Sequence, residues 1–482
     1  MTSSQIHSPS ARNLRHDALQ IWQAGVEAVR SQRLVEQHLR IEGKILQVGS
    51  QAIPLDAIRR IAVVGAGKAG AGMAEAVEHV LGPEWMQEKQ LAGWVNVPAD
   101  CVRPLRRIHL HAARPAGINE PMPEGVAGAE KILQLVELLG PADLCLCLIS
   151  GGGSALMPAP VADITLADKL AVTRHLSAAG ANIEQLNTVR KQLSRIKGGG
   201  LLRACRAGRM ATLIISDVLG DPLDVIASGP TVPDSSTPQA ALDVLEQFGA
   251  RAAGISSSVF EYLESAGGED QRTFQGLLAP GYSRDTCVTN LVIGNNATAV
   301  AAAKEEAERL GYAANAESAD RSERPAEEVG RRLARQARAM RAGPRPTCFI
   351  SGGEPVVKLV DASRRGLGGR NQQLVLAALT ELAGDGAGGI VLLSGGTDGE
   401  DGPTDAAGAI LDVGVLIAAR QAGLDPADYL ARNDAYHFFA PLDALIRTGP
   451  THTNVCDVRV VLARTEKSPT GVPTTASVGD LG

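Results

Sequence analysis

One pattern recurs along this 482-residue chain. A short run of Val, Ile and Leu is followed by a loop rich in Gly, Ser or Asp, and then by a segment with helical spacing. Continuous apolar runs are typical of strands that are buried on both faces of a sheet. Strands that alternate with helices predict parallel sheets with right-handed crossovers. The clearest runs begin near residues 61, 144, 213, 291, 348 and 390.

Each of these loops follows the carboxyl end of a predicted strand, which is where open α/β sheets bind ligands. Six such loops exceed what one small ligand needs, so the sequence predicts two sheets that face a shared cleft. The expected fold class is α/β, with two domains whose mainly parallel, doubly wound, Rossmann-like sheets flank that cleft. The 53 glycines fit loops in which the backbone turns sharply or approaches a ligand closely.

Changes in composition predict the domain boundaries. The polar stretch between 264 and 286 contains Gly and Pro and has weak periodicity, which is typical of a linker. The end of the second domain, about 433–465, could return to pack on the first. The predicted units are a disordered N-terminus (1–14), an N-terminal α/β domain (15–263), a linker (264–286), a C-terminal α/β domain (287–465) and a disordered tail (466–482).

Charge and composition exclude several classes of protein. The net charge is −6, which argues against a dedicated nucleic-acid binder because phosphate contacts need a basic surface. No apolar run approaches 18 residues, so no transmembrane helix is predicted, and the N-terminal residues lack the apolar core of a signal peptide. The seven cysteines form no Cys-x-x-Cys motif. A cytoplasmic monomer or homodimer is expected, with no nucleic-acid or membrane partner.

The segment GAGKAG at 65–70 matches the G-x-G-x-x-G dinucleotide pattern between a strand and a helix. A dinucleotide site also needs an acidic residue about 20 positions later, at the end of the next strand. The next predicted strand, 93–98, ends about 30 residues later and Asp100 lies beyond it. Lys68 in the loop instead favours an anion site, and a purely structural turn remains a third interpretation.

Two further segments suggest anion recognition. SGGGSA at 150–155 presents backbone N–H groups before a helix, as a phosphate or carboxylate cradle requires. The basic segment 187–201 is predicted to be a short helix that ends at three glycines. Its Arg190, Ser194 and Lys197 have the spacing of one helix face. Such local positive charge in an acidic protein suggests an acidic ligand, although a solvated face is an equal alternative.

Acidic loops follow two other predicted strands. Asp217 and Asp221 lie in SDVLGDPLD, and Asp398, Asp401 and Asp405 lie in SGGTDGEDGPTDAAGA. Carboxylates with glycine at strand ends suit Mg²⁺, which prefers oxygen ligands. Any one of these aspartates could simply form a turn, but turn formation explains less well why two such loops contain five aspartates.

An arginine also stands at a predicted helix start. Arg370 follows a glycine turn in GLGGRNQQ, where its guanidinium could clamp a phosphoryl group or a carboxylate. His437 and His452 are too isolated in the sequence to indicate catalysis or metal binding.

Taken together, the ordered motifs resemble those of the class II glycerate kinases, the MOFRL family. The shared segments extend over about residues 15–465, and they are GAGKAG, SGGGSA, NTVRK with KGG, SDVLGD with ASGPT, SGGE, GGRNQ, GTDGEDGPTDAAGA and TGPTHTNV. This chain departs from the family pattern at SGGEP, at GGRNQQ and at His452. Relatives often carry the name hydroxypyruvate reductase.

The resemblance implies two α/β domains and transfer of the ATP γ-phosphoryl group to the 2-hydroxyl of D-glycerate, with ATP and Mg²⁺ as cofactors. The family's cleft lysine and arginine fall on Lys68 and Arg370, and Asp217 completes the expected catalytic set. The expected metal ligands are Asp398, Asp401 and Asp221. The residues expected to bind substrate or phosphate are Gly67, Gly151, Gly152, Gly153, Ser154, Asn187, Arg190, Lys197, Ser351, Gly352, Gly353 and Glu354.

Two other functions stay open from the residues alone. The literal G-x-G-x-x-G match allows an NAD(P)H-dependent hydroxypyruvate reductase. Gly- and Ser-rich loops at strand ends would also suit a non-catalytic protein that binds sugar acids or phosphosugars. The acidic loops favour the kinase, because a simple anion binder has no reason to place carboxylates beside its site.

Overall fold

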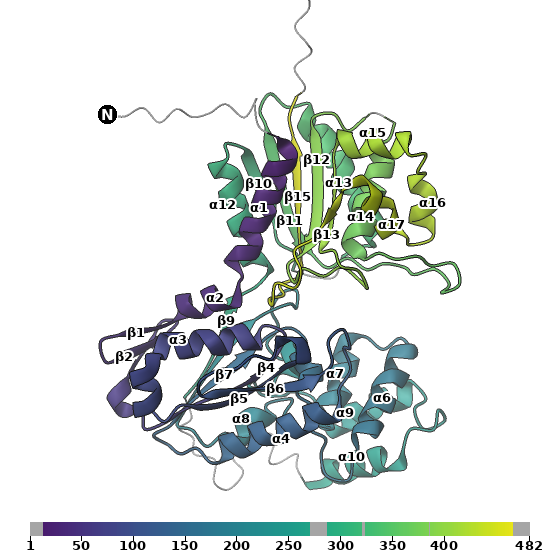
Figure 1. Cartoon of the computed structure of the whole chain (residues 1–482). Helices are drawn as coiled ribbons and strands as arrows, with labels where there is room; N and C mark the ends of the chain where they lie inside the picture. The colour runs from purple at the N-terminus through teal and green to yellow at the C-terminus, as the bar shows by residue number, and fades with distance from the viewer. Residues whose placement is uncertain (1–12, 270–286, 321–322, 385, 466–482) are drawn as a thin grey trace, which may run out of the picture.

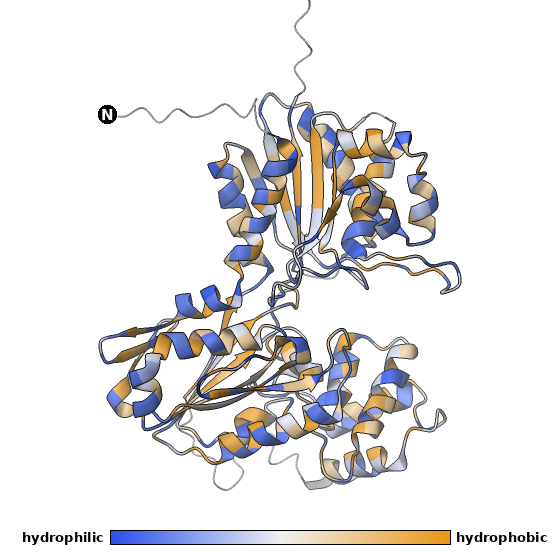
Figure 2. Cartoon of the chain, in the orientation of Figure 1, coloured by the Kyte–Doolittle hydropathy of each residue, from blue (hydrophilic) through white to orange (hydrophobic). Residues whose placement is uncertain are grey.

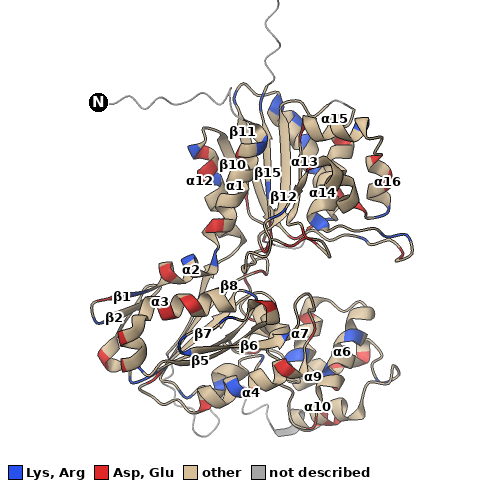
Figure 3. Cartoon of the chain, in the orientation of Figure 1, with Lys and Arg blue, Asp and Glu red and all other residues tan. Residues whose placement is uncertain are grey.

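The computed structural model describes residues 13–269, 287–320, 323–384 and 386–465. Two α/β units lie one above the other in Figure 1, each built around its own sheet. The α/β class and the two sheets agree with the sequence prediction. Charged residues lie mainly along the helices, whereas the strands are largely uncharged (Figure 3). Among the described residues, no helix combines the length and apolar character needed to cross a membrane.

The first sheet has six parallel strands in the order β6-β5-β4-β7-β8-β9. This is the strand order of a dinucleotide-binding fold, in which the direction of winding reverses between the first and fourth strands. Here that switch point lies between β4 and β7. The strands are β4 (Ile61–Ala66), β5 (Ala92–Pro98), β6 (Ile108–Arg114), β7 (Leu144–Ile149), β8 (Arg209–Ile215) and β9 (Cys287–Gly294).

Helices and a small antiparallel sheet surround the first sheet. Side-chain caps begin three of these helices, at Thr165, Asn182 and Thr237, where each cap accepts a bond from the backbone N–H three residues later. The elements are α2 (Ser31–His38), β1 (Leu39–Glu42), β2 (Ile45–Val48), β3 (Gln51–Pro54), α3 (Gly70–Glu88), α4 (Pro123–Glu137), α5 (Gly153–Leu156), α6 (Leu166–Ala178), α7 (Ile183–Gln192), α8 (Gly200–Ala204), α9 (Pro238–Gln247) and α10 (Ser257–Glu269).

The second sheet also has six strands, in the order β10-β11-β15-β12-β13-β14. It is mixed rather than mainly parallel, because β15 runs antiparallel to both of its neighbours and β13 runs antiparallel to β12 and β14. The final strand thus enters between two parallel strands from the opposite end. The strands are β10 (Ala313–Glu317), β11 (Thr347–Gly353), β12 (Ile390–Gly396), β13 (Gly408–Leu411), β14 (Leu445–Ile446) and β15 (Asp457–Ala463).

The helices of the second unit pack on both faces of this sheet. They are α1 (Leu14–Ala28), α12 (Asn296–Arg309), α13 (Ala326–Arg341), α14 (Arg370–Leu382), α15 (Val413–Gln421), α16 (Pro426–Ala431) and α17 (Ala435–Phe439). The sequence analysis assigned the opening helix α1 to the first domain, and this prediction was wrong, because α1 belongs to the second unit. It packs against α12, β12 and β15, and its Trp22 donates a hydrogen bond of 3.2 Å to the carbonyl oxygen of Gly395.

The predicted domain boundary also needs correction. The strand β9 was assigned to the second domain, but it forms the edge of the first sheet beside β8. The predicted linker therefore does not join the domains. Its first part, 264–269, ends α10, and the rest lies outside the described residues, as do 1–12 and 466–482. The chain instead passes between the domains after α1 and after β9.

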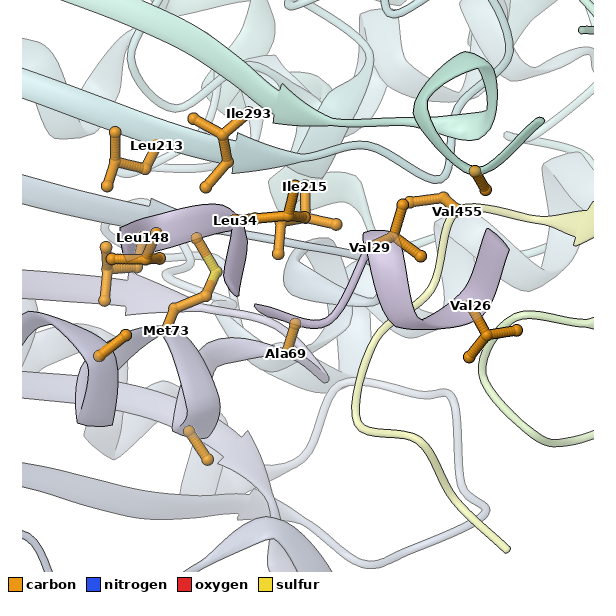
Figure 4. Close-up of a cluster of buried hydrophobic side chains, with 14 of the residues drawn as sticks. Val26, Val29, Leu34, Ala69, Met73, Leu148, Leu213, Ile215, Ile293 and Val455 are labelled. Atoms are coloured by element: carbon orange, nitrogen blue, oxygen red, sulfur yellow. The ribbon is translucent and has the colours of Figure 1, made fainter. Parts of the chain in front are cut away.

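The last segment of the chain, 433–465, contacts both units. Its strand β15 lies inside the second sheet, but the residues just before it reach the first domain. Asn454 Nδ2 donates to the Asp217 carboxylate at 3.2 Å, and Thr453 Oγ1 donates to the Val29 carbonyl oxygen at 2.7 Å. A buried cluster runs through this junction from Leu148 and Ile215 of the first sheet to Val29 and Val455 (Figure 4). The strands of both sheets are largely hydrophobic (Figure 2).

Candidate active site

A cleft of about 1460 Å³ lies between the two units, at the carboxyl ends of β7, β8, β11 and β12. A smaller cavity of about 470 Å³ adjoins it, and Lys68 lines that cavity. Asp398 and Glu400 line both spaces. Of the residues expected from the sequence, the cleft brings together Gly152, Gly153, Ser154, Asn187, Arg190, Asp217, Glu354, Arg370, Asp398 and Asp401.

The two glycine-rich loops of the first sheet are bonded to each other at its switch point. The backbone N–H of Lys68 donates to the Gly151 carbonyl oxygen at 2.9 Å. Gly67 has a φ of +152°, and a Cβ there would lie 2.0 Å from Ser150 Oγ. A Cβ on Gly151 would lie 2.3 Å from an oxygen of Asp217. Gly67 is thus needed for packing against Ser150, not for the approach of a pyrophosphate as in a dinucleotide site.

Lys68 reaches from the first unit to carboxylates of the second. Its Nζ lies 2.8 Å from Glu400 Oε2 and 3.5 Å from Asp398 Oδ2. Burial by itself lowers the pKa of Lys68, but the two carboxylates outweigh burial and raise that pKa above its ordinary value. The ammonium group is therefore charged, and it lines the smaller cavity. The expectation that it contacts a bound anion stays a prediction.

Arg370 is the first residue of α14 and is held by two acids. Its Nε and one terminal nitrogen donate to the two oxygens of Asp457, at 2.8 and 3.0 Å. The other terminal nitrogen donates to Glu354 at 2.9 Å. The Asp457 side chain is fully buried. Burial by itself lowers the pKa of Arg370, but the attraction of Asp457 outweighs burial and raises that pKa above its ordinary value. The guanidinium is thus fixed at the cleft wall in a bidentate pair.

A corner of the cleft gathers cationic and hydroxyl groups of the first unit around Ser154. Its Oγ accepts hydrogen bonds from Arg190 at 2.5 Å and from Lys197, and it lies 3.0 Å from Ser228 Oγ. Ser228 in turn donates to Asn187 Oδ1 at 3.1 Å. We call Ser154, Asn187, Arg190, Lys197 and Ser228 the basic corner.

The chain reaches this arrangement differently from the predicted single helix. The helix α7 ends at Gln192, so Arg190 lies on it and Lys197 lies beyond it. Gly198 and Gly199, at φ of +53° and +74°, reverse the chain and begin α8 rather than ending α7. Lys197 then points back to the carbonyl oxygen of Ser154 at 2.8 Å. The two cations meet through this turn, not through helical spacing.

The basic corner lacks a negative partner among the described residues. In the described part of the chain, Arg190 and Lys197 bond to Ser154 and form no ion pair with a carboxylate, and burial lowers the pKa of both side chains. Ser228 is held at a φ of +62° next to Ala227 at +51°, and such left-handed non-glycine residues cost about 1–3 kcal/mol each. Strain and uncompensated charge in one place indicate a site that receives an anion.

The four expected acids occupy different environments. Asp217 and Asp398 face the cleft, whereas Asp401 is buried and accepts bonds from the backbone N–H groups of Asn371 and Gln372. Asp401 therefore caps the start of α14. Asp221 is hydrogen-bonded by Asn295 and does not line the cleft. Within the described residues, no three His, Cys, Asp or Glu side chains converge on a point where a metal ion would bind.

Asp217, Glu354 and Asp398 are nevertheless close enough to influence one another. Burial raises the pKa of all three carboxyl groups, and repulsion from neighbouring carboxylates adds to the increase: Glu354 and Asp398 act on Asp217, and Asp457 acts on both Glu354 and Asp398. For Asp217 the result is a pKa of about 6. A cation between them would relieve this repulsion, so these residues fit a divalent ion that keeps most of its ligands on a nucleotide.

The segment Ser351–Gly353 contributes less than expected. Its residues are the buried end of β11, and a Cβ on Gly352 would overlap Asn296. Of SGGE only Glu354 lines the cleft. The sequence analysis missed Ser228, Glu400 and Asp457 as separate site residues, although all three lie within or next to its motifs. Their acidic or hydroxyl side chains, in or beside those motifs, were the available signal.

The raised pKa of Asp217 leads to a prediction about stability. An unfolded Asp has a pKa of about 4, so the folded chain binds this proton more tightly. The free energy of unfolding should therefore fall as the pH rises from about 4 to about 6 and then level off. Asp217→Asn should raise the thermal midpoint at pH 7 more than at pH 4, measured in EDTA. The exposed Asp243→Asn is the control, and equal effects at both pH values would contradict the expectation.

Comparisons with known proteins agree with this architecture. The DUF4147 model, described as a domain of unknown function, matches residues 17–264, and the MOFRL family model matches residues 347–457. The glycerate kinase of Rattus norvegicus is 35% identical over 94% of each chain. An Agrobacterium vitis protein that carries the name hydroxypyruvate reductase is 38% identical over 84% of this chain and 87% of its own.

A solved structure shows the same fold. The crystal structure of a glycerate kinase from Thermotoga maritima aligns with a TM-score of 0.77 and 34% identity, covering 93% of this chain and 99% of that one. Matches of this length and identity include both units and the cleft between them. The chain therefore belongs to the glycerate kinase family, with an N-terminal DUF4147 domain and a C-terminal MOFRL domain.

Proposed function

We propose that this chain transfers the γ-phosphoryl group of ATP to the 2-hydroxyl of D-glycerate, giving 2-phosphoglycerate and ADP. The observation that carries the proposal is that two cationic groups from opposite units lie in adjoining spaces, Arg370 in the main cleft beside the basic corner and Lys68 in the smaller cavity. Phosphoryl transfer depends mainly on positioning and on neutralising the charge of the moving group. The choice of the 2-hydroxyl rests on the family resemblance.

The geometry suggests a role for each part. The acceptor oxygen forms a bond to the γ-phosphorus while the bond to the β-phosphate oxygen breaks and ADP leaves. Asp217, with its pKa of about 6, would accept the hydroxyl proton. Lys68 and Arg370 would face the charge on the transferred group. The basic corner and the backbone of 151–153 would hold an anionic group of one substrate.

Mg²⁺ fits the acidic side of the cleft as described above. Asp398 and Glu354 would hold the ion, together with the phosphates of the nucleotide. When bound, the ion would neutralise charge on the β- and γ-phosphates. Asp398 lies beside Lys68 in this structure. When the nucleotide binds, Asp398 would turn to the metal ion and Lys68 to the phosphates.

One assay with the purified chain separates the candidate functions. We expect ADP release with D-glycerate and Mg-ATP, and a product that enolase consumes without a mutase. NADH oxidation with hydroxypyruvate and no ADP release would instead establish a reductase. Binding without either reaction would indicate a non-catalytic protein. Enolase consumption only after adding the mutase would move the phosphoryl group to the 3-hydroxyl.

Removal of a cation from the basic corner should weaken binding of a substrate. Arg190→Met should raise the KM of one anionic substrate by about 10- to 100-fold, because a hydrogen bond to a charged group contributes about 1.5–3 kcal/mol. Steady-state kinetics with each substrate varied in turn measure this. Arg174→Met, which removes an exposed partner of Glu120, is the matched control. Unchanged KM values for both substrates would exclude the corner from binding.

A further inference from the structure

The smaller cavity contains a second cation that the mechanism above does not use. Arg114 ends β6, is only 4% exposed and lines this cavity together with Lys68 and Asn119. The cavity shares Asp398 and Glu400 with the main cleft. A molecule in the smaller space would thus meet a molecule in the larger one at a common wall.

The hydrogen bonds of Arg114 leave part of its guanidinium unused. One terminal nitrogen donates to Asn119 Oδ1 at 2.8 Å and to the carbonyl oxygen of Ile118. Nε has no partner among the described residues, and no bond is formed by the other terminal nitrogen. That nitrogen lies against the SGGG loop, because a Cβ on Gly152 would come within 3.1 Å of it.

No described carboxylate neutralises Arg114. Asp100 lines the same cavity and attracts the guanidinium, but it forms no ion pair with it. Glu400 also attracts the guanidinium from the wall of the cavity, but its ion pair, like that of Asp398, is with Lys68. Burial lowers the pKa of Arg114, which reflects the cost of an unpaired charge. Buried charges in proteins are ordinarily paired, so the group that is missing here is an anion.

We propose that the smaller cavity binds the carboxylate of the small hydroxy acid, with Arg114 as its anchor, and that the larger cleft binds the nucleotide. This assignment rests on the proposed function. The cavity has ample room for a three-carbon acid, and the cleft is about three times larger. The cleft also exposes apolar side chains, Ile183, Val356 and Leu359, which suit a nucleotide base. The acceptor hydroxyl would then lie at the common wall, near Lys68.

The test compares D-glycerate with glyceramide, in which a neutral amide replaces the carboxylate. In the wild type, KM should be about 10- to 100-fold lower for D-glycerate than for glyceramide. In Arg114→Met the KM for D-glycerate should rise by that factor, the preference over glyceramide should vanish, and the KM for ATP should stay unchanged. Arg114→Lys should recover part of the preference. Arg107→Met, an exposed arginine before the same strand, should behave like the wild type.

Arg114 also bonds to its own loop, so loss of fold must be separated from loss of recognition. The thermal midpoint should rise with ATP in both proteins, but with D-glycerate only in the wild type. An Arg114→Met protein that retains its preference for the carboxylate would overturn the proposal, and so would an equal rise in the KM for ATP. A wild type that releases no ADP would overturn the proposed function instead, and stabilisation by D-glycerate would still test the cavity.

Discussion

Lys68→Ala is expected to lower kcat/KM by about 10²–10³-fold while leaving the fold intact. The Lys68 ammonium group lies between the units, 2.8 Å from Glu400. From this position it can stabilise the negative charge that develops on the transferred phosphoryl group. Removing one preorganised donor from a developing negative charge costs about 3–4 kcal/mol of transition-state stabilisation. The side chain is about one-third exposed, so the free energy of unfolding should change by no more than about 1 kcal/mol.

Steady-state kinetics and thermal unfolding of the same sample measure these two effects. Lys44→Ala provides the control, because it also removes a lysine paired with an acid, but on the surface. Near-normal turnover in Lys68→Ala would remove this residue from catalysis. An unfolded variant would show that the lysine holds the two units together through Asp398 and Glu400.

Arg370→Met is expected to have the largest effect, lowering kcat by about 10³-fold and also destabilising the chain. Arginines that stabilise the charge of a transferring phosphoryl group contribute about this factor or more. The loss of stability has a separate cause, because Asp457 is fully buried and would lose its bidentate partner. Breaking such a buried pair costs about 3 kcal/mol or more.

A second substitution separates the two effects. In Arg370→Met/Asp457→Asn the buried charge is gone, so the thermal midpoint should recover substantially while kcat stays low. Arg364→Met, an exposed arginine before the same helix, should match the wild type in both measurements. Recovery of activity in the double variant would show that Arg370 only neutralises Asp457.

Much of the local structure could be predicted from the sequence. The apolar runs became strands, because burial on both faces of a sheet selects continuous Val, Ile and Leu. The loops after β7, β8, β11 and β12 line the cleft, whereas the loop after β4 lines the smaller cavity. The motif resemblance pointed to the family that the comparisons then showed. The separate roles expected of Lys68, Arg370 and Asp217 remain predictions, although the structure brings all three to the same region.

Other features depended on contacts between distant residues. The strand β9 pairs with the edge of the first sheet, and the helix α1 packs on a face of the second sheet. These pairings depend on residues far away in the sequence, so the local pattern of either element does not reveal them. For the same reason, the glycine in GAGKAG that resembles a cofactor contact faces Ser150 instead.

The sequence by itself determined the strands, the loops and the kinds of side chain available for an anionic substrate, since these depend on neighbours along the chain. Only the tertiary structure decided which charges are paired. Asp401 became a helix cap and Asp457 became the partner of Arg370, whereas Arg114 and the basic corner have no ion-paired carboxylate among the described residues. The physical reason is that the cost of a buried charge depends on the groups around it in space, and these include residues that lie hundreds of positions away in sequence.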